Sequence, residues 1–157
     1  MNNNQTLIQI SSAELANANN VQQLISQKEF EIKLVDINSM HLSNQDASTY
    51  FYNQQRKQSL QTDISSLKLQ RDNHINAAIS YALILAEREL NERSYFSNAS
   101  LLLANIRSFM TIQSIRFTVS LPVMLKISLL NSRLQRSSGH SSLKHELTNL
   151  KMQLQIS

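Results

Sequence analysis

Cysteine and tryptophan are absent from this 157-residue chain, and glycine and proline occur once each, as Gly139 and Pro122. The absence of cysteine excludes disulfide scaffolds, thiolate zinc sites and cysteine nucleophiles. The scarcity of glycine and proline disfavours tight hairpins, glycine-rich phosphate loops and many-stranded sandwiches. Many enzyme classes are thereby disfavoured as well.

The first residues carry no positive charge and form no long apolar stretch, and the first arginine is Arg56. Neither a secretory signal nor a transit peptide fits this start. We therefore expect a cytoplasmic location, with export without a cleaved signal peptide as the alternative.

Leucine and isoleucine dominate the apolar residues, with 23 and 14 copies against four of valine. Serine, asparagine and glutamine supply most of the polar residues, with 23, 16 and 15 copies. In a chain of the usual size of one compact domain, this balance predicts a single domain of all-α class.

A capping pattern marks the first predicted helix. Ser11 is placed to accept a hydrogen bond from the third helical N–H, and Glu14 to reach back to the helix start. We therefore expect a flexible tail over 1–11 and a helix over 12–41. Residues 28–35 alternate between charged and apolar side chains, so a strand there is the alternative. The helical interpretation rests on four residues at helical spacing, namely Phe30, Leu34, Ile37 and His41.

A second, longer helix is predicted over 47–93, where no glycine or proline interrupts the chain. Its apolar stripe widens over 75–86, which we expect to be core. The helix at 12–41 is its natural partner in an antiparallel hairpin, the centre of a helical bundle. A second heptad register places Arg71 and His74 at normally apolar positions, where polar groups specify register or partner. The alternative is that the true stripe passes beside them.

Three shorter helices are predicted in the last third of the chain, over 98–113, 120–135 and 142–156. Ser97 is the expected cap of the first, and Ser120 caps the second with Pro122 in its first turn. Residues 113–129 alternate between apolar and polar side chains. A strand there, within an α+β fold, is the alternative.

Leucines at coiled-coil spacing follow a serine-rich linker at 136–142. This pattern divides the chain into a helical domain at 12–135 and a C-terminal helix at 143–157. The apolar seam of that helix is Leu143, Leu147, Leu150 and Leu154. With Leu147 at position a, Glu146 and Lys151 fall at g and e, where a parallel second chain would pair them. The seam is a candidate for self-association, and docking on the domain's own core is the alternative, because two heptads are too short to associate stably.

Positive charge is concentrated after residue 99, where seven basic residues stand against one acid, Glu146. The seven are Arg107, Arg116, Lys126, Arg133, Arg136, Lys144 and Lys151. Such a stripe suits nucleic-acid phosphate, an acidic protein surface or the acidic half of a neighbouring copy. Peripheral membrane contact and a plain solvated face are the other interpretations.

Catalytic chemistry is not indicated by any cluster of residues. No serine lies in a nucleophile-elbow context, and the acids Glu87, Glu89 and Glu92 fit a solvated helical surface. The four histidines are not spaced as metal ligands usually are, so we expect no metal and no cofactor. Together with the lack of a catalytic cluster, this leads us to expect no enzyme activity. The sequence predicts a non-catalytic interaction or structural subunit that self-associates or docks in a larger assembly. A nucleic-acid-binding accessory protein is the alternative.

Overall fold

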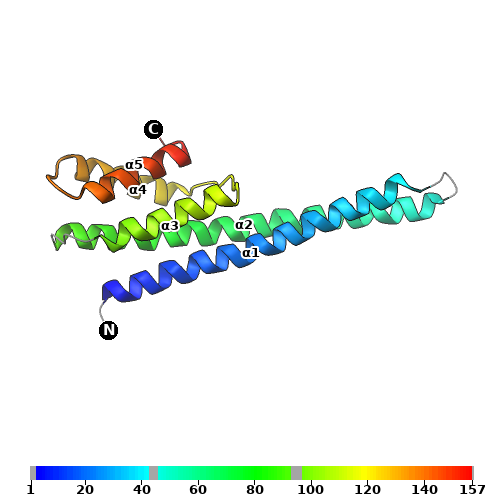
Figure 1. Cartoon of the computed structure of the whole chain (residues 1–157), viewed down its shortest axis with the longest axis horizontal. Helices are drawn as coiled ribbons and strands as arrows, with labels where there is room; N and C mark the ends of the chain where they lie inside the picture. The colour runs from blue at the N-terminus through cyan, green and yellow to red at the C-terminus, as the bar shows by residue number, and fades with distance from the viewer. Residues whose placement is uncertain (1–2, 43–45, 93–96, 157) are drawn as a thin grey trace. The chain divides into compact units, whose positions relative to one another are not determined.

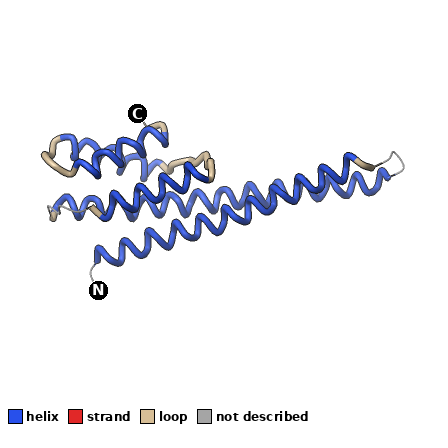
Figure 2. Tube along the Cα trace, viewed as in Figure 1, coloured by secondary structure: helices blue, strands red, loops and turns tan. Residues whose placement is uncertain are grey.

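The computed structural model describes residues 3–42, 46–92 and 97–156, and all regular elements in these ranges are helical (Figure 1 and Figure 2). The helices are α1 (Asn3–Met40), α2 (Ala47–Asn91), α3 (Asn98–Ile112), α4 (Leu121–Gln135) and α5 (Ser141–Leu154). The predicted all-α fold is confirmed. The helix bounds agree closely with the predicted ones except at the start of α1, and the predicted last residue of the long helix, 93, lies outside the described residues.

Both strand alternatives are wrong. Residues 28–35 lie inside α1, and most of 113–129 lies in α4 or in the irregular segment that precedes it. The alternation over 121–129 is also compatible with a helix, because residues four apart lie on the same helical face. The alternating apolar residues therefore form two rows, one at 121, 125 and 129 and the other at 123 and 127. Val123 and Ile127 are buried, whereas the other row is exposed.

The start of α1 also differs from the prediction, because residues 3–11 are helical and do not form a tail. The two residues of the predicted capping pattern contact α2 instead of capping a helix start. Ser11 lies inside the helix and is buried, and its hydroxyl donates to the carbonyl of Ala78 at 2.9 Å. Glu14 contacts His74 instead of the helix start, with its carboxylate 2.6 Å from the Nδ1 atom. Contacts with α2 therefore explain both side chains.

The chain divides into two compact units, of which unit 1 comprises residues 1–17 and 72–157 and unit 2 comprises residues 18–71. This division differs from the predicted boundary at the 136–142 linker. That segment joins two helices of the same unit, since α5 packs on both α3 and α4.

Unit 1 contains most of the buried apolar side chains, and the predicted core over 75–86 is confirmed. In α2 the buried residues of this stretch are Ile75, Ala78, Ile79, Ala82, Leu83, Leu85 and Ala86. The shorter helices add Leu102, Leu103, Ile106, Met110, Val123, Ile127, Leu130, Leu134, Leu143, Leu147 and Leu150.

Unit 2 is a two-helix hairpin made from the later part of α1 and the earlier part of α2. Ion pairs between the described residues of its two helices include Lys28–Asp63 at 3.4 Å, Arg56–Glu31 at 3.6 Å and Lys57–Asp36 at 2.9 Å. All six side chains are partly exposed to solvent, so these pairs contribute little to stability.

Candidate interaction surfaces

The predicted leucine seam is buried within unit 1. Leu143, Leu147 and Leu150 are at most 1% exposed, and Leu154 is half-buried. Their helix packs on α3 and α4. The leucines are therefore covered by the protein's own helices in this conformation, as the docking alternative expects.

Of the two charged residues of the seam, Glu146 is engaged within the chain. Glu146 accepts two hydrogen bonds from the Arg107 guanidinium, at 3.1 Å from Nε and 3.3 Å from the terminal nitrogen. This two-point geometry is the strong form of an arginine–carboxylate pair. Lys151 lies half-buried in the last turn of α5.

The seven basic residues after residue 99 do not form one compact cluster. Arg107 is engaged with Glu146, and Lys144 Nζ donates to the Ser137 carbonyl at 2.6 Å. Lys126 and Arg133 line a common cleft. The remaining three lie on separate segments, Arg116 between α3 and α4, Arg136 at the end of α4 and Lys151 on α5.

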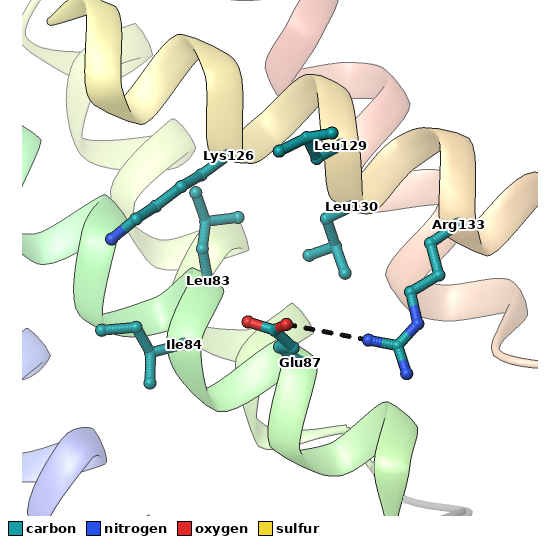
Figure 3. A pocket seen from close by; sticks show the side chains of 7 residues that line it. All are labelled: Leu83, Ile84, Glu87, Lys126, Leu129, Leu130 and Arg133. Carbon is teal, nitrogen blue, oxygen red and sulfur yellow. Dashed lines mark ion pairs between the residues drawn. The ribbon is translucent and has the colours of Figure 1, made fainter.

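The common cleft lies at the surface between α2 and α4 and has a volume of about 140 Å³ (Figure 3). Its lining residues are Leu83, Ile84, Glu87, Lys126, Leu129, Leu130 and Arg133. Figure 3 shows the Arg133 guanidinium facing the Glu87 carboxylate across the cleft, and the two groups are 3.7 Å apart. Lys126 Nζ donates to the Ser80 hydroxyl at 3.2 Å. An apolar interior with charged groups around it suits an apolar side chain of a partner more than a reacting substrate.

The outer face of α4 carries a row of exposed leucines next to this cleft. Leu121, Leu125 and Leu129 are 64%, 54% and 72% exposed and lie four residues apart, hence on one face. We call them the α4 row. Arg136 follows the row, and residues 121–136 contain no acid.

The exposed face of α1 in unit 2 carries a second apolar row. Phe30, Leu34 and Ile37 are 60%, 45% and 51% exposed. Their spacing of four and three residues places them on one face, as in the seam of a coiled coil. We call them the α1 row. The spacing recognised in the sequence is therefore helical, but the residues lie at the surface and not in the core.

In unit 2, the exposed large apolar side chains outnumber the buried apolar side chains. Its buried apolar residues are Ala18, Ile25, Val35, Leu60 and Ile64. Its exposed ones are Leu24, Phe30, Leu34, Ile37, Met40, Tyr50, Phe51, Tyr52 and Leu69. Grouped exposed apolar side chains of this kind mark surfaces that contact a partner.

The two polar residues of the second heptad register both contact polar side chains of α1. In unit 2, Arg71 is 5% exposed and donates to Gln22 Oε1 at 2.9 Å. In unit 1, His74 contacts Glu14, while the neighbouring Ile75 is fully buried. Arg71 and His74 thus lie against α1, and the apolar stripe passes beside them through Ile75. The polar contacts favour one alignment of α1 on α2.

Two further polar residues of α2 position the shorter helices, and the sequence analysis missed both roles. Glu89 is 5% exposed and accepts hydrogen bonds at the start of α3, so its placement on a solvated surface is wrong. Asn76 accepts from Ser120 N at 2.9 Å and donates to Thr118 O at 3.3 Å, which fixes the chain ahead of α4. Neither contact has a local sequence signal, because the partners of Glu89 lie across the connection between α2 and α3 and those of Asn76 lie more than 40 residues away.

Among the described residues, no three histidine, aspartate or glutamate side chains come together as a metal site would require. In the same ranges, none of the helices combines the length and the apolar character needed to cross a membrane. In comparisons with protein-family models, with curated proteins and with solved structures, nothing matches this chain.

Proposed function

We propose that the protein is a non-catalytic helical structural subunit that self-associates, and that the hairpin of unit 2 supplies the principal contact. The observation that carries this proposal is the exposed α1 row, Phe30, Leu34 and Ile37. A helix with an apolar face is stable when that face is buried against another element. A two-helix hairpin has no further helix of its own to cover the second apolar face of α1.

The charges of unit 2 are compatible with a second copy as the partner and do not favour nucleic acid. Residues 18–71 contain six basic and five acidic residues, so the unit is nearly neutral. A nearly neutral surface gives no electrostatic preference for a strongly acidic or strongly basic partner, such as nucleic acid. Helical hairpins that pair with each other complete four-helix bundles, in which each apolar face is covered.

The acids near the α2–α4 cleft support a non-catalytic role. Glu87 is paired with Arg133, and Glu89 is buried against the backbone at the start of α3. Acid–base catalysis needs a carboxyl group placed to exchange a proton with a substrate. Both carboxylates are instead engaged in contacts between helices.

Light scattering during size-exclusion chromatography tests this proposal. We expect the wild-type protein to elute as a multiple of its 17.9 kDa chain mass. The variant Phe30→Gln/Leu34→Gln/Ile37→Gln should elute as a monomer, and its circular dichroism should stay helical because glutamine is a good helix former.

A matched control removes exposed apolar surface from unit 1 instead. Leu101, Ile112 and Met152 are 52%, 75% and 73% exposed, so Leu101→Gln/Ile112→Gln/Met152→Gln is expected to associate like the wild type. A wild-type protein that stays monomeric at every concentration contradicts the proposal. A monomer that carries excess absorbance at 260 nm would turn the assignment to nucleic-acid binding.

A further inference from the structure

We propose that the α4 row and the adjoining cleft bind an acidic amphipathic helix of a different protein. The juxtaposition that carries this inference is an exposed apolar row beside an apolar cleft, along a segment, 121–136, with three bases and no acid. The surface belongs to unit 1. It therefore adds a second contact to the one proposed for unit 2, and neither contact depends on the other.

The apolar part of this surface is a row with a hollow beside it (Figure 3). Leu129 belongs both to the row and to the lining of the cleft, where Leu83 and Leu130 extend the apolar surface. An amphipathic helix binds such a surface through side chains three and four residues apart. A cavity of roughly 150 Å³ accommodates a benzene ring. The cleft of about 140 Å³ therefore has room for one apolar side chain of the bound helix.

Two of the three bases along the row are not neutralised by acids of the protein. Lys126 Nζ contacts the Ser80 hydroxyl, which carries no charge. Within the described ranges, no acid pairs with Lys126 or with Arg136. Arg136 follows Leu129 by seven residues, which places it on the side of the helix that carries the row. The positive charge beside the row is therefore available to a partner.

The acid that lines the cleft and the single acid of α5 are both engaged by other bases. Glu87 is paired with the third base of the row, Arg133, at 3.7 Å. Glu146 accepts both of its hydrogen bonds from Arg107 of α3. The remaining positive charge of the row therefore favours an acidic partner.

A second copy of this chain is a poor occupant, because its exposed α1 row carries little free negative charge. Two of the three acids beside that row are paired with bases of α2, Glu31 with Arg56 and Asp36 with Lys57. The same stretch of α1 also contains the base Lys33. The partner that fits is therefore a different protein, whose acids beside an apolar row are free to pair.

A protein helix also fits this surface better than nucleic acid or a lipid bilayer. The phosphates of nucleic acid would contact the bases but would leave Leu121, Leu125 and Leu129 without a contact. The headgroups of an anionic bilayer would face the Glu87 carboxylate, whose side chain is 63% exposed beside the row. An apolar centre with charged groups at its edge is the usual composition of a protein interface.

Fluorescence anisotropy with a designed peptide tests this inference on the full chain. The probe is a labelled helical peptide of about 18 residues, with leucines at helical spacing and glutamates beside them. A second peptide has lysines in place of the glutamates. We expect the wild-type protein to bind the glutamate peptide at least about tenfold more tightly than the lysine peptide, because the available charges of the row are positive.

Removal of leucines tests the apolar part of the contact. Leu125→Gln/Leu129→Gln should weaken binding of the glutamate peptide by about tenfold or more, since burial of one leucine is worth about that much. The matched control, Leu101→Gln/Ile112→Gln, removes two exposed apolar side chains of α3 and should bind like the wild type. Circular dichroism shows that both variants keep their helices. Equal binding by the two variants would overturn the inference.

A charge reversal separates specific binding from a general effect of substitution. Lys126→Glu/Arg136→Glu should bind the lysine peptide more tightly than the glutamate peptide, which a damaged surface would not do. Arg116→Glu/Lys151→Glu changes the total charge equally outside α4 and should keep the wild-type preference. An unchanged preference of the α4 variant, or no binding of either peptide to the wild type, would overturn the inference. Binding to phosphatidylserine vesicles in place of the peptides, lost in the leucine variant, would overturn it too and assign the surface to lipid.

Discussion

The Glu89 carboxylate near the end of α2 accepts hydrogen bonds from the first two backbone N–H groups of α3. Glu89 Oε2 is 2.7 Å from Asn98 N, and Oε1 is 3.0 Å from Ala99 N. The Ser97 hydroxyl also donates to Oε1 at 3.2 Å and accepts from Ser100 N at 3.0 Å. The N-terminus of a helix has unpaired N–H groups and a partial positive charge, and a carboxylate satisfies both. One side chain of α2 therefore adds to the capping of α3 that Ser97 provides.

Replacing Glu89 by alanine should lower the free energy of unfolding by about 2–3 kcal/mol, because it leaves buried N–H groups of α3 without an acceptor. Urea unfolding followed by circular dichroism measures this change. The matched control is Glu87→Ala, whose exposed ion pair with Arg133 should contribute less than about 1 kcal/mol. Equal effects of the two variants would contradict the capping role of Glu89.

The buried contact between Arg71 and Gln22 predicts a non-additive pair of substitutions. Gln22→Leu should destabilise the protein by about 1–3 kcal/mol, because it removes an acceptor from a buried guanidinium. Adding Arg71→Met should recover much of the loss, since an apolar pair of similar volume replaces a buried polar one.

The measurement is a double-mutant cycle of urea unfolding for these two positions. Coupling energies of about 0.5–3 kcal/mol are usual for residues that share a hydrogen bond. Additive effects would mean that the two side chains act independently, and the contact would then not contribute to the alignment of α1 and α2.

Local patterns in the sequence predict the helices well, because each helix has its own start signal or apolar spacing. Ser97 is an example: it is the N-cap of α3, and its side chain accepts from Ser100 N as the spacing predicts. Ser120 and Pro122 likewise mark the start of α4, although the Ser120 side chain makes no capping hydrogen bond. The boundaries at these positions are therefore encoded within a few neighbouring residues.

Contacts between distant residues account for what the sequence analysis did not predict. Ser11 and Glu14 have the spacing of a helix start, but Ala78 and His74 of α2 are their partners. An amphipathic spacing also does not reveal whether its face is covered. The α5 leucines and the α1 row share coiled-coil spacing, yet α5 is covered by α3 and α4 and the α1 row is exposed.

The turn before α5 gives a prediction about backbone conformation. Gly139 has a φ of +96°, a region that side-chain-bearing residues rarely adopt, and no atom lies within 4 Å of where a Cβ would be. Gly139→Ala should therefore destabilise the protein by about 1 kcal/mol through backbone strain alone, without a clash. Thermal unfolding measures the loss. Gly139→Asn should cost less, because asparagine tolerates positive φ better than alanine, and equal costs would contradict the strain argument.

Substitutions in the leucine seam distinguish a buried core from an interface between chains. Leu147 is 0% exposed, so Leu147→Ala should lower the free energy of unfolding by about 2–5 kcal/mol, as large-to-small changes in a core do. The half-buried Leu154 serves as the control, and Leu154→Ala should cost clearly less.

Light scattering on the same two seam variants gives the second readout. If the seam is core, the folded fraction of Leu147→Ala should keep the wild-type mass, because the α1 row is unchanged. A variant of wild-type stability that has become monomeric would instead place the seam between chains. That result would require α5 to leave its contacts with α3 and α4 when the protein associates.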